Sequence, residues 1–66
     1  MKFANKQHVR MMEQAFSVPR TVADACDHCG VPPALAPSAV RLLLYTDRIT
    51  ETADRQGRPA YVKVVR

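Results

Sequence analysis

The first third of the chain carries a helical pattern of apolar residues. Val9, Met12 and Phe16 recur at the i, i+3 and i+7 spacing that puts side chains on one side of a helix. The charged residues of this stretch fall mostly on the other sides. The pattern predicts a helix over Asn5 to Phe16, and Pro19 ends the segment.

A second, short helix is predicted over Val22 to Cys29. Thr21 stands where an N-cap residue belongs, and Asp24 three residues later gives a weak capping box, with Asp in place of Glu or Gln. Gly30 follows as a C′ residue that can adopt a positive φ, and the Pro-Pro pair shortly after it prevents the helix from continuing.

A third helix is predicted over Ser38 to Thr46. Pro37 is acceptable at its first position, where the missing N–H costs nothing. The segment Val31 to Ala36 is expected to be a connection with room for one turn of its own. Leu42 and Tyr45 are expected to point sideways or outward. The buried stripe of this helix is expected to hold four apolar residues: Ala39, Val40, Leu43 and Leu44.

The last third changes to segments rich in Thr, Val and Tyr. Ile49 to Ala53 and Ala60 to Val65 are separated by a polar loop in which Gly57 supplies a positive-φ position. This pattern predicts a β-hairpin with a loop longer than the tight two-residue kind. Three helices followed by a hairpin indicate an α+β fold, mainly α. With no repeat or linker, 66 residues form one domain.

Charge is concentrated at the two ends of the chain. Residues 1–20 carry four basic residues and one acidic residue, and residues 48–66 carry five basic and two acidic residues. Between them, residues 21–47 carry one basic and three acidic residues. The net charge is +4. Any polyanion is therefore expected to bind mainly through the ends.

Neither a membrane segment nor a secretion signal is expected. The longest clearly apolar stretch, Leu42 to Tyr45, is far shorter than the roughly 20 residues of a bilayer-spanning helix. The N-terminus lacks the charged, apolar and small-residue regions of a signal peptide. The sequence predicts a soluble, cytoplasmic protein with no membrane partner.

The two cysteines raise the question of a metal site. Cys26 and Cys29 form one CxxC pair with no second pair at a finger spacing, and on a helix His28 points about 200° away from Cys26. At a helix C-terminus the dipole raises a thiol pKa, which disfavours redox chemistry. We expect no metal and no cofactor, and Cys26 is best explained as a small core residue.

Catalysis has no support either. The chain contains no plausible serine, histidine and carboxylate arrangement and no glycine-rich phosphate cradle, and its six acidic residues are scattered over surface-like positions. We therefore expect a protein that is not an enzyme and that has no small-molecule substrate.

The order of elements resembles a known architecture. Thr21 to Val31 resembles the first helix and turn of a helix-turn-helix, Ser38 to Tyr45 its recognition helix, and Ile49 to Val65 a wing. Together they resemble the winged helix-turn-helix DNA-binding domains, including ArsR-type and MarR-type bacterial regulators. The resemblance implies one winged-helix domain over residues 1–66, with the helix-turn-helix at about 21–47 and the wing at about 49–65.

The resemblance also implies a function: sequence-specific binding of double-stranded DNA by a small bacterial or phage transcriptional regulator. The third helix would enter the major groove, where Arg41 is suited to read a guanine edge. The wing loop would reach phosphates, so affinity should fall with salt, and a dimer would supply specificity. The residues expected to contact DNA are Arg20, Thr21, Ser38, Arg41, Tyr45, Arg55, Gln56 and Arg58.

Several of these residues also have structural explanations that the sequence leaves open. Thr21 and Ser38 can simply cap their helices. Arg41 can be a solvated or ion-paired surface residue, and the loop over residues 54–59 can be an ordinary solvated tip.

An alternative function belongs to a different class. Leu35, Leu42 and Tyr45 are apolar or aromatic side chains left over once the core is filled, and such surfaces usually meet a partner or a second copy. The alternative hypothesis is a winged-helix protein-interaction module that binds its partner through these three residues.

Overall fold

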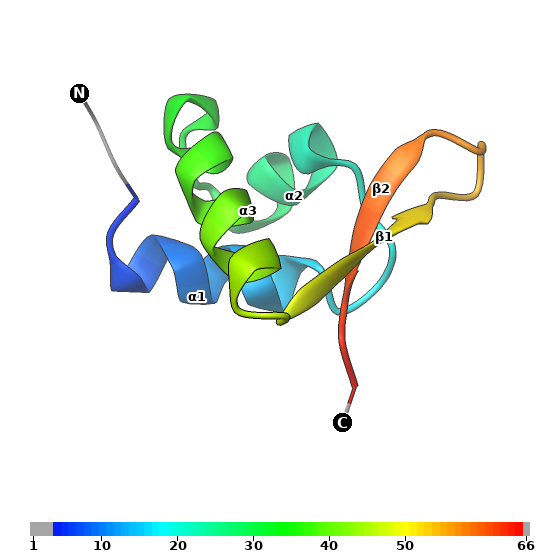
Figure 1. The fold of residues 1–66 in the computed structure, drawn as a ribbon. Coiled ribbons are helices and arrows are strands. Elements are labelled where there is room, and N and C mark those ends of the chain that lie inside the picture. Colours follow the sequence, from blue (N-terminus) through cyan, green and yellow to red (C-terminus); the bar gives the residue numbers. More distant parts are fainter. Residues whose placement is uncertain (1–3, 66) are drawn as a thin grey trace.

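Three helices and a two-stranded antiparallel hairpin make up residues 4–65, the part of the chain that the computed structural model describes. Figure 1 shows the helices packed together, with the hairpin extending away from them. The α+β, mainly α, architecture is thereby confirmed. In chain order the elements are α1 (Lys6–Ala15), α2 (Val22–Cys29), a 3₁₀ turn η1 (Pro33–Leu35), α3 (Ala36–Tyr45), β1 (Ile49–Ala53) and β2 (Pro59–Lys63).

Helix α1 is held at its start by a reciprocal cap. Asn5 Oδ1 accepts a hydrogen bond from the His8 backbone N–H at 2.9 Å, and His8 Nδ1 accepts one from the Asn5 N–H at 3.4 Å. These bonds satisfy two backbone donors that the first turn leaves free. Asn5 and Phe16 are therefore the caps of the helix rather than its first and last residues.

Helix α2 begins and ends as the sequence predicts. The Thr21 hydroxyl accepts a hydrogen bond from the Asp24 backbone N–H at 3.2 Å. At the other end Gly30 adopts φ +79°, and its N–H donates to the Cys26 carbonyl at 2.8 Å. The left-handed conformation of Gly30 turns the chain away from the helix axis.

Helix α3 begins two residues earlier than predicted, at Ala36. The 3₁₀ turn η1 leads directly into it, and Ala36 takes helical angles (φ −60°, ψ −42°) although a proline follows. The general preference of pre-proline residues for extended backbone is overridden here. Pro37 still lies in the first turn, where no N–H is needed.

The end of α3 uses a non-glycine residue in a left-handed conformation. Asp47 has φ +57°, its N–H donates to the Leu44 carbonyl at 3.1 Å, and the Arg48 N–H donates to the Leu43 carbonyl at 2.8 Å. These two bonds form a Schellman motif. The motif turns the chain into β1.

Strand β2 is paired on both of its edges. On one edge it pairs with β1, with Glu51 opposite Tyr61. On the other edge Arg20 and Tyr61 exchange two backbone hydrogen bonds of 3.1 and 2.9 Å, and the Lys63 N–H donates to the Phe16 carbonyl at 2.7 Å. The segment between α1 and α2 thus contacts this edge of β2 through an isolated bridge and one further backbone hydrogen bond. Local sequence patterns did not indicate this pairing.

The predicted bounds of the second strand need a correction. Strand β2 begins at Pro59 and ends at Lys63, whereas the sequence indicated Ala60 to Val65. It ends there because its partner β1 begins at Ile49, opposite Lys63. Pro59 is tolerated as the first residue of the strand, where its missing donor breaks no central ladder bond.

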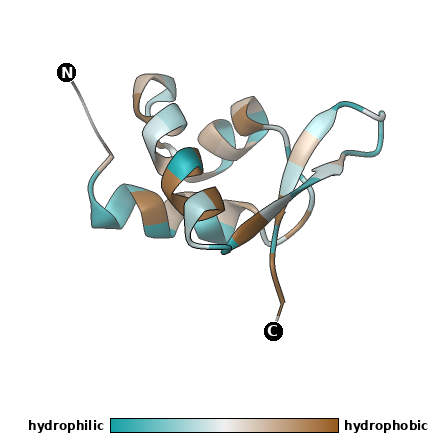
Figure 2. Cartoon of the chain, viewed as in Figure 1, coloured by the Kyte–Doolittle hydropathy of each residue, from teal (hydrophilic) through white to brown (hydrophobic). Residues whose placement is uncertain are grey.

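The core lies where the helices meet the base of the hairpin. Phe16 is fully buried and meets Tyr61 edge to face, with ring centroids 6.0 Å apart. Leu44 is half-buried rather than fully buried. Figure 2 shows that the turn between the strands and the first turn of α1 are hydrophilic. The buried side chains are Met12, Ala15, Phe16, Ala25, Cys26, Val31, Ala36, Ala39, Val40, Leu43, Ile49 and Ala60.

Candidate nucleic-acid interface

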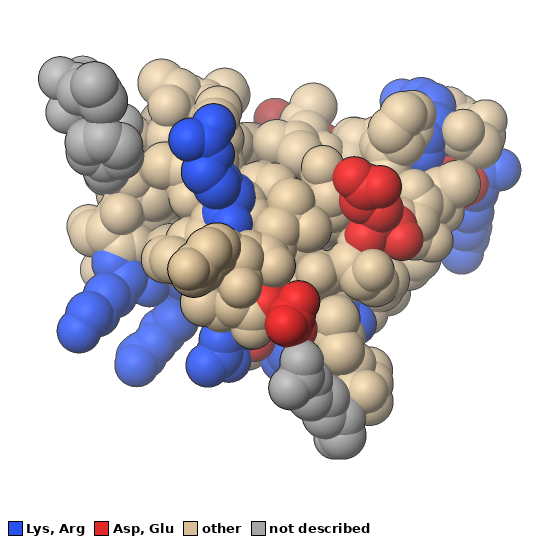
Figure 3. All heavy atoms as spheres, viewed as in Figure 1, with Lys and Arg blue, Asp and Glu red and all other residues tan. Residues whose placement is uncertain are grey.

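The outer side of α3 is uncovered within residues 4–65. Arg41 is exposed, and Tyr45, one helical turn later on the same side, is 86% exposed. Leu42 beside them is 48% exposed. Figure 3 shows a single basic side chain over α3 on this face, with acidic side chains elsewhere on it. The structure therefore places Arg41 and Tyr45, two of the predicted contact residues, on one side of α3.

Ser38 has a structural task at the start of this helix. Its hydroxyl donates to the Leu35 carbonyl at 3.0 Å and accepts a hydrogen bond from the Ala4 N–H at 2.9 Å. The side chain fixes the residue that leads into α1 against the first turn of α3. Ser38 is not the N-cap of α3, because the helix has already begun at Ala36.

The turn of the hairpin is organised around one carboxylate. Asp54 Oδ1 accepts hydrogen bonds from the backbone N–H groups of Gln56 and Arg58, each at 2.9 Å, and its Oδ2 accepts from Arg58 Nε at 2.7 Å. The backbone hydrogen bond from Arg58, followed by the contacts of its side chain and of Gln56, holds the pKa of Asp54 below its ordinary value. Gly57 takes φ +78° to close the turn.

The two arginines of the turn are placed differently. Arg58 is bonded to Asp54, and its Nη2 also lies 3.5 Å from Asp24 Oδ2 on α2. Two carboxylates thus compensate its charge. Arg55 is exposed and has no ion-pair partner among residues 4–65. Arg55 is consequently the cation of this turn that is free to meet a phosphate.

Arg20 lies beside the hairpin turn, and Thr21 follows it at the start of α2. Arg20 lines one hollow together with Arg55, Gln56 and Arg58, so the fold joins four of the predicted contact residues. Arg20 Nε is buried and has no hydrogen-bond partner. Thr21 is the N-cap of α2, which uses its hydroxyl internally.

Sequence reasoning overlooked a cluster of cations around Glu13. Arg48 Nη1 and Lys63 Nζ each lie 3.7 Å from a Glu13 carboxylate oxygen. Lys6 and Arg10, one turn apart on α1, are exposed on the same helix. Figure 3 shows basic side chains projecting along the lower edge, where Figure 1 places α1. The signal was the i, i+4 spacing of Lys6 and Arg10 outside the apolar stripe.

The cysteines are free thiols with packing roles. Cys26 is buried in the core, as predicted, and burial raises the pKa of its thiol, with smaller contributions from Cys29 and Asp27. Cys29 Sγ donates to Met12 Sδ at 3.7 Å. Within the part of the chain that the structure describes, no three His, Cys, Asp or Glu side chains gather to hold a metal ion.

The order and pairing of the elements are compatible with a winged-helix shape. No protein-family model matches the sequence, and no match is found among the curated proteins or among the solved structures. None of the helices in residues 4–65 combines the length and apolar character needed to cross a bilayer.

Proposed function

We propose that the protein binds double-stranded DNA as a winged helix-turn-helix protein, with the outer side of α3 in the major groove and the hairpin turn on the backbone. The observation that carries the proposal is the uncovered face of α3 on which Arg41 and Tyr45 lie one turn apart. An α-helix fits the major groove, which is about 12 Å wide. The net charge of +4 favours a polyanionic partner.

Each contact residue has a role in this proposal. Arg41 reads a base edge, which discriminates by about 1–3 kcal/mol, and Tyr45 extends the contact along α3. Arg55 and Gln56 meet phosphates from the hairpin turn. The remaining candidates act less directly: Arg58 fixes the turn, Arg20 lies behind it, and Thr21 and Ser38 shape the helix starts.

The proposal includes a biological setting. A single small domain buries only about 600–1,000 Å² on DNA, so a dimer on two half-sites would supply specificity. The resemblance to ArsR-type and MarR-type proteins supports a transcriptional regulator of bacterial or phage type. Free Cys26 and Cys29 favour a reducing compartment such as the cytoplasm.

The test is a titration of fluorescent random-sequence duplex DNA at two salt concentrations. We expect micromolar or tighter binding that weakens with salt, and an Arg55→Glu variant that lowers the magnitude of the salt slope by about one unit or more. Arg41→Ala should reduce preference among selected sites more than it reduces random binding. Arg10→Glu, on α1, is the charge-matched control. Absence of binding at low salt would refute the proposal.

A protein partner on the same face is the second candidate. The exposure of Leu42 and Tyr45 supports it, whereas Leu35 is partly buried and packs against the core. Leu42→Ser with Tyr45→Ser separates the candidates, because it should abolish partner binding while Arg55-dependent DNA binding persists.

A further inference from the structure

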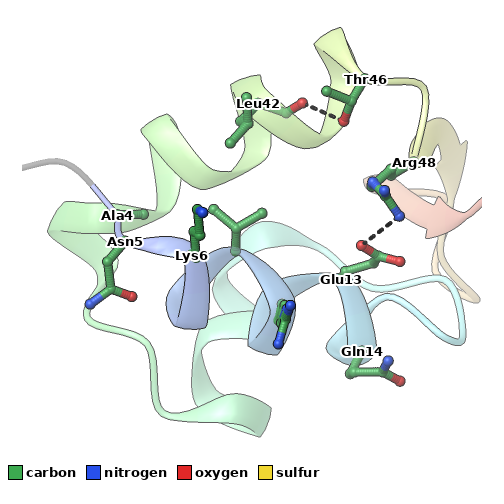
Figure 4. Close-up of a pocket in the computed structure, with 10 residues that line it drawn as sticks. Ala4, Asn5, Lys6, Glu13, Gln14, Leu42, Thr46 and Arg48 are labelled. Carbon is green, nitrogen blue, oxygen red and sulfur yellow. Dashed lines mark hydrogen bonds and ion pairs between the residues drawn. The ribbon is translucent and has the colours of Figure 1, made fainter.

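A groove runs between α1 and α3 and is separate from the hairpin hollow. Its volume is roughly 570 Å³, and Val9 of α1 and Leu42 of α3 supply its apolar walls. Figure 4 shows the Leu42 side chain directed from α3 toward α1, with Thr46 and Arg48 toward one end and Asn5 toward the other. Leu42 remains 48% exposed, so the side chains of residues 4–65 leave this apolar surface unfilled.

The rim of the groove is positively charged. Lys6 and Arg10 line it, are exposed, and have no ion-pair partner among residues 4–65. Arg48 is a third lining cation. Glu13 is the one acidic lining residue, and it is already opposed by Arg48 and by Lys63, each at 3.7 Å. The groove therefore offers unbalanced positive charge beside an apolar surface.

We propose that this groove binds an acidic amphipathic helix of a partner protein. The apolar residues of such a helix would cover Val9 and Leu42, in the manner of helices that lay their apolar side into a groove. Lys6 and Arg10 are four residues apart, which is about 6 Å along the axis of α1. That spacing matches two carboxylates one turn apart on the partner helix.

The apolar walls favour a peptide over a nucleic-acid backbone. The phosphates of a nucleic acid would pair with Lys6 and Arg10, but they would leave the Leu42 side chain in contact with water. Such binding would bury no apolar surface. The groove also shares no lining residue with the hollow around Arg20 and Arg55. The groove residues on α1 have no part in the proposed DNA contact, so they distinguish the two proposals.

The experiment uses the whole ¹⁵N-labelled protein and a synthetic 18-residue peptide. The peptide has Leu at positions i, i+3, i+4 and i+7, which form an apolar stripe along one side of a helix, and Glu at the positions on either side of this stripe. A matched peptide has Gln in place of Glu. We expect the Glu peptide to shift the amide resonances of Val9, Leu42 and Thr46. The double variant Lys6→Glu, Arg10→Glu should weaken binding at least tenfold, and Leu42→Ser should weaken it as well.

The controls separate the groove from general charge attraction. Arg55→Glu, outside the groove, should leave the dissociation constant within twofold, and the Gln peptide should bind at least tenfold more weakly. Circular dichroism checks that each variant is folded, and Lys6→Gln, Arg10→Gln replaces the double variant if it is not.

Three outcomes would overturn the proposal. The first is an absence of shifts at the groove, and the second is equal binding of the Glu and Gln peptides. The third is a shift of the Val9 amide, on α1, by random duplex DNA, or a shift of the groove residues on raising the protein concentration alone, because the occupant would then be a nucleic acid or a second copy of the chain.

Discussion

Arg58 and Asp24 join the hairpin turn to α2 through a 3.5 Å ion pair, although 34 residues separate them in the chain. Both side chains are about half exposed. Exposed pairs of this kind contribute only about 0–1 kcal/mol. Their effect here is to orient the turn that carries Arg55 relative to the helices, rather than to stabilise the fold.

Replacing Arg58 should therefore loosen the turn without unfolding the domain. In an Arg58→Met variant we expect larger fast-timescale motion of the amides at residues 54–58, because the contacts to Asp54 and Asp24 are lost. Heteronuclear NMR relaxation measures this motion. Arg55→Met is the matched control and should leave the turn as rigid as before; equal loosening in both variants would contradict the assigned role of Arg58.

The ordered conformation of the hairpin turn should be lost at low pH. The pKa of Asp54 is lowered in the folded protein, so its contribution to stability is complete above the ordinary carboxyl pKa. That contribution is lost as the pH falls through the lowered value. An NMR titration should show the Gln56 and Arg58 amides changing together with the Asp54 carboxyl, and Asp54→Asn should remove that transition. An Asp54 pKa at or above the ordinary value would contradict the structure.

Two glycines hold backbone conformations that other residues adopt at a cost. Gly30 and Gly57 have φ of +79° and +78°, and an added Cβ would meet no atom within 4 Å at either position. Replacement by Ala should therefore cost only the conformational penalty, about 1 kcal/mol at each site. Urea unfolding measures the loss. Gly30→Asn should lower the free energy of unfolding less than Gly30→Ala, because Asn tolerates the left-handed region better.

The two thiols should react at different rates. Cys26 is 4% exposed with a raised pKa, whereas Cys29 is only partly buried. Because the thiolate is the reactive form, an alkylating reagent at neutral pH should modify Cys29 first and reach Cys26 only when the domain opens. Mass spectrometry with Cys29→Ser distinguishes the sites. Rapid modification of Cys26 in the folded Cys29→Ser protein would argue against its place in the core.

Local signals in the sequence were sufficient for most elements. A helix cap, a helix end and a turn could be predicted from Thr21, Gly30 and Gly57, because each of these residues acts on neighbours only a few positions away. The pairing of Arg20 with Tyr61 could not be anticipated, since no local spacing encodes a backbone bridge between distant segments. The early start of α3 was also missed, because the 3₁₀ turn before it overrides a pre-proline preference.

The candidate site was predicted only in part. The exposure of Arg41 and Arg55 follows from their positions on a helix surface and a loop. The pairing of Arg58 with Asp24 and the bond from Ala4 to Ser38 depend on tertiary packing. The groove between α1 and α3 likewise exists only once the two helices are packed. Sequence patterns identify the charged residues, but tertiary packing determines which of them have an ion-pair partner.

The double pairing of β2 has a consequence for solubility. Because the segment that contains Arg20 covers one edge of β2, β1 supplies the open edge of the sheet within residues 4–65. That edge is only five residues long and carries Glu51 at its centre, between two threonines. A second molecule adding a strand there would bring like charges together and gain few hydrogen bonds. The open edge within residues 4–65 is therefore short and carries a charge at its centre, two features that disfavour edge-to-edge pairing.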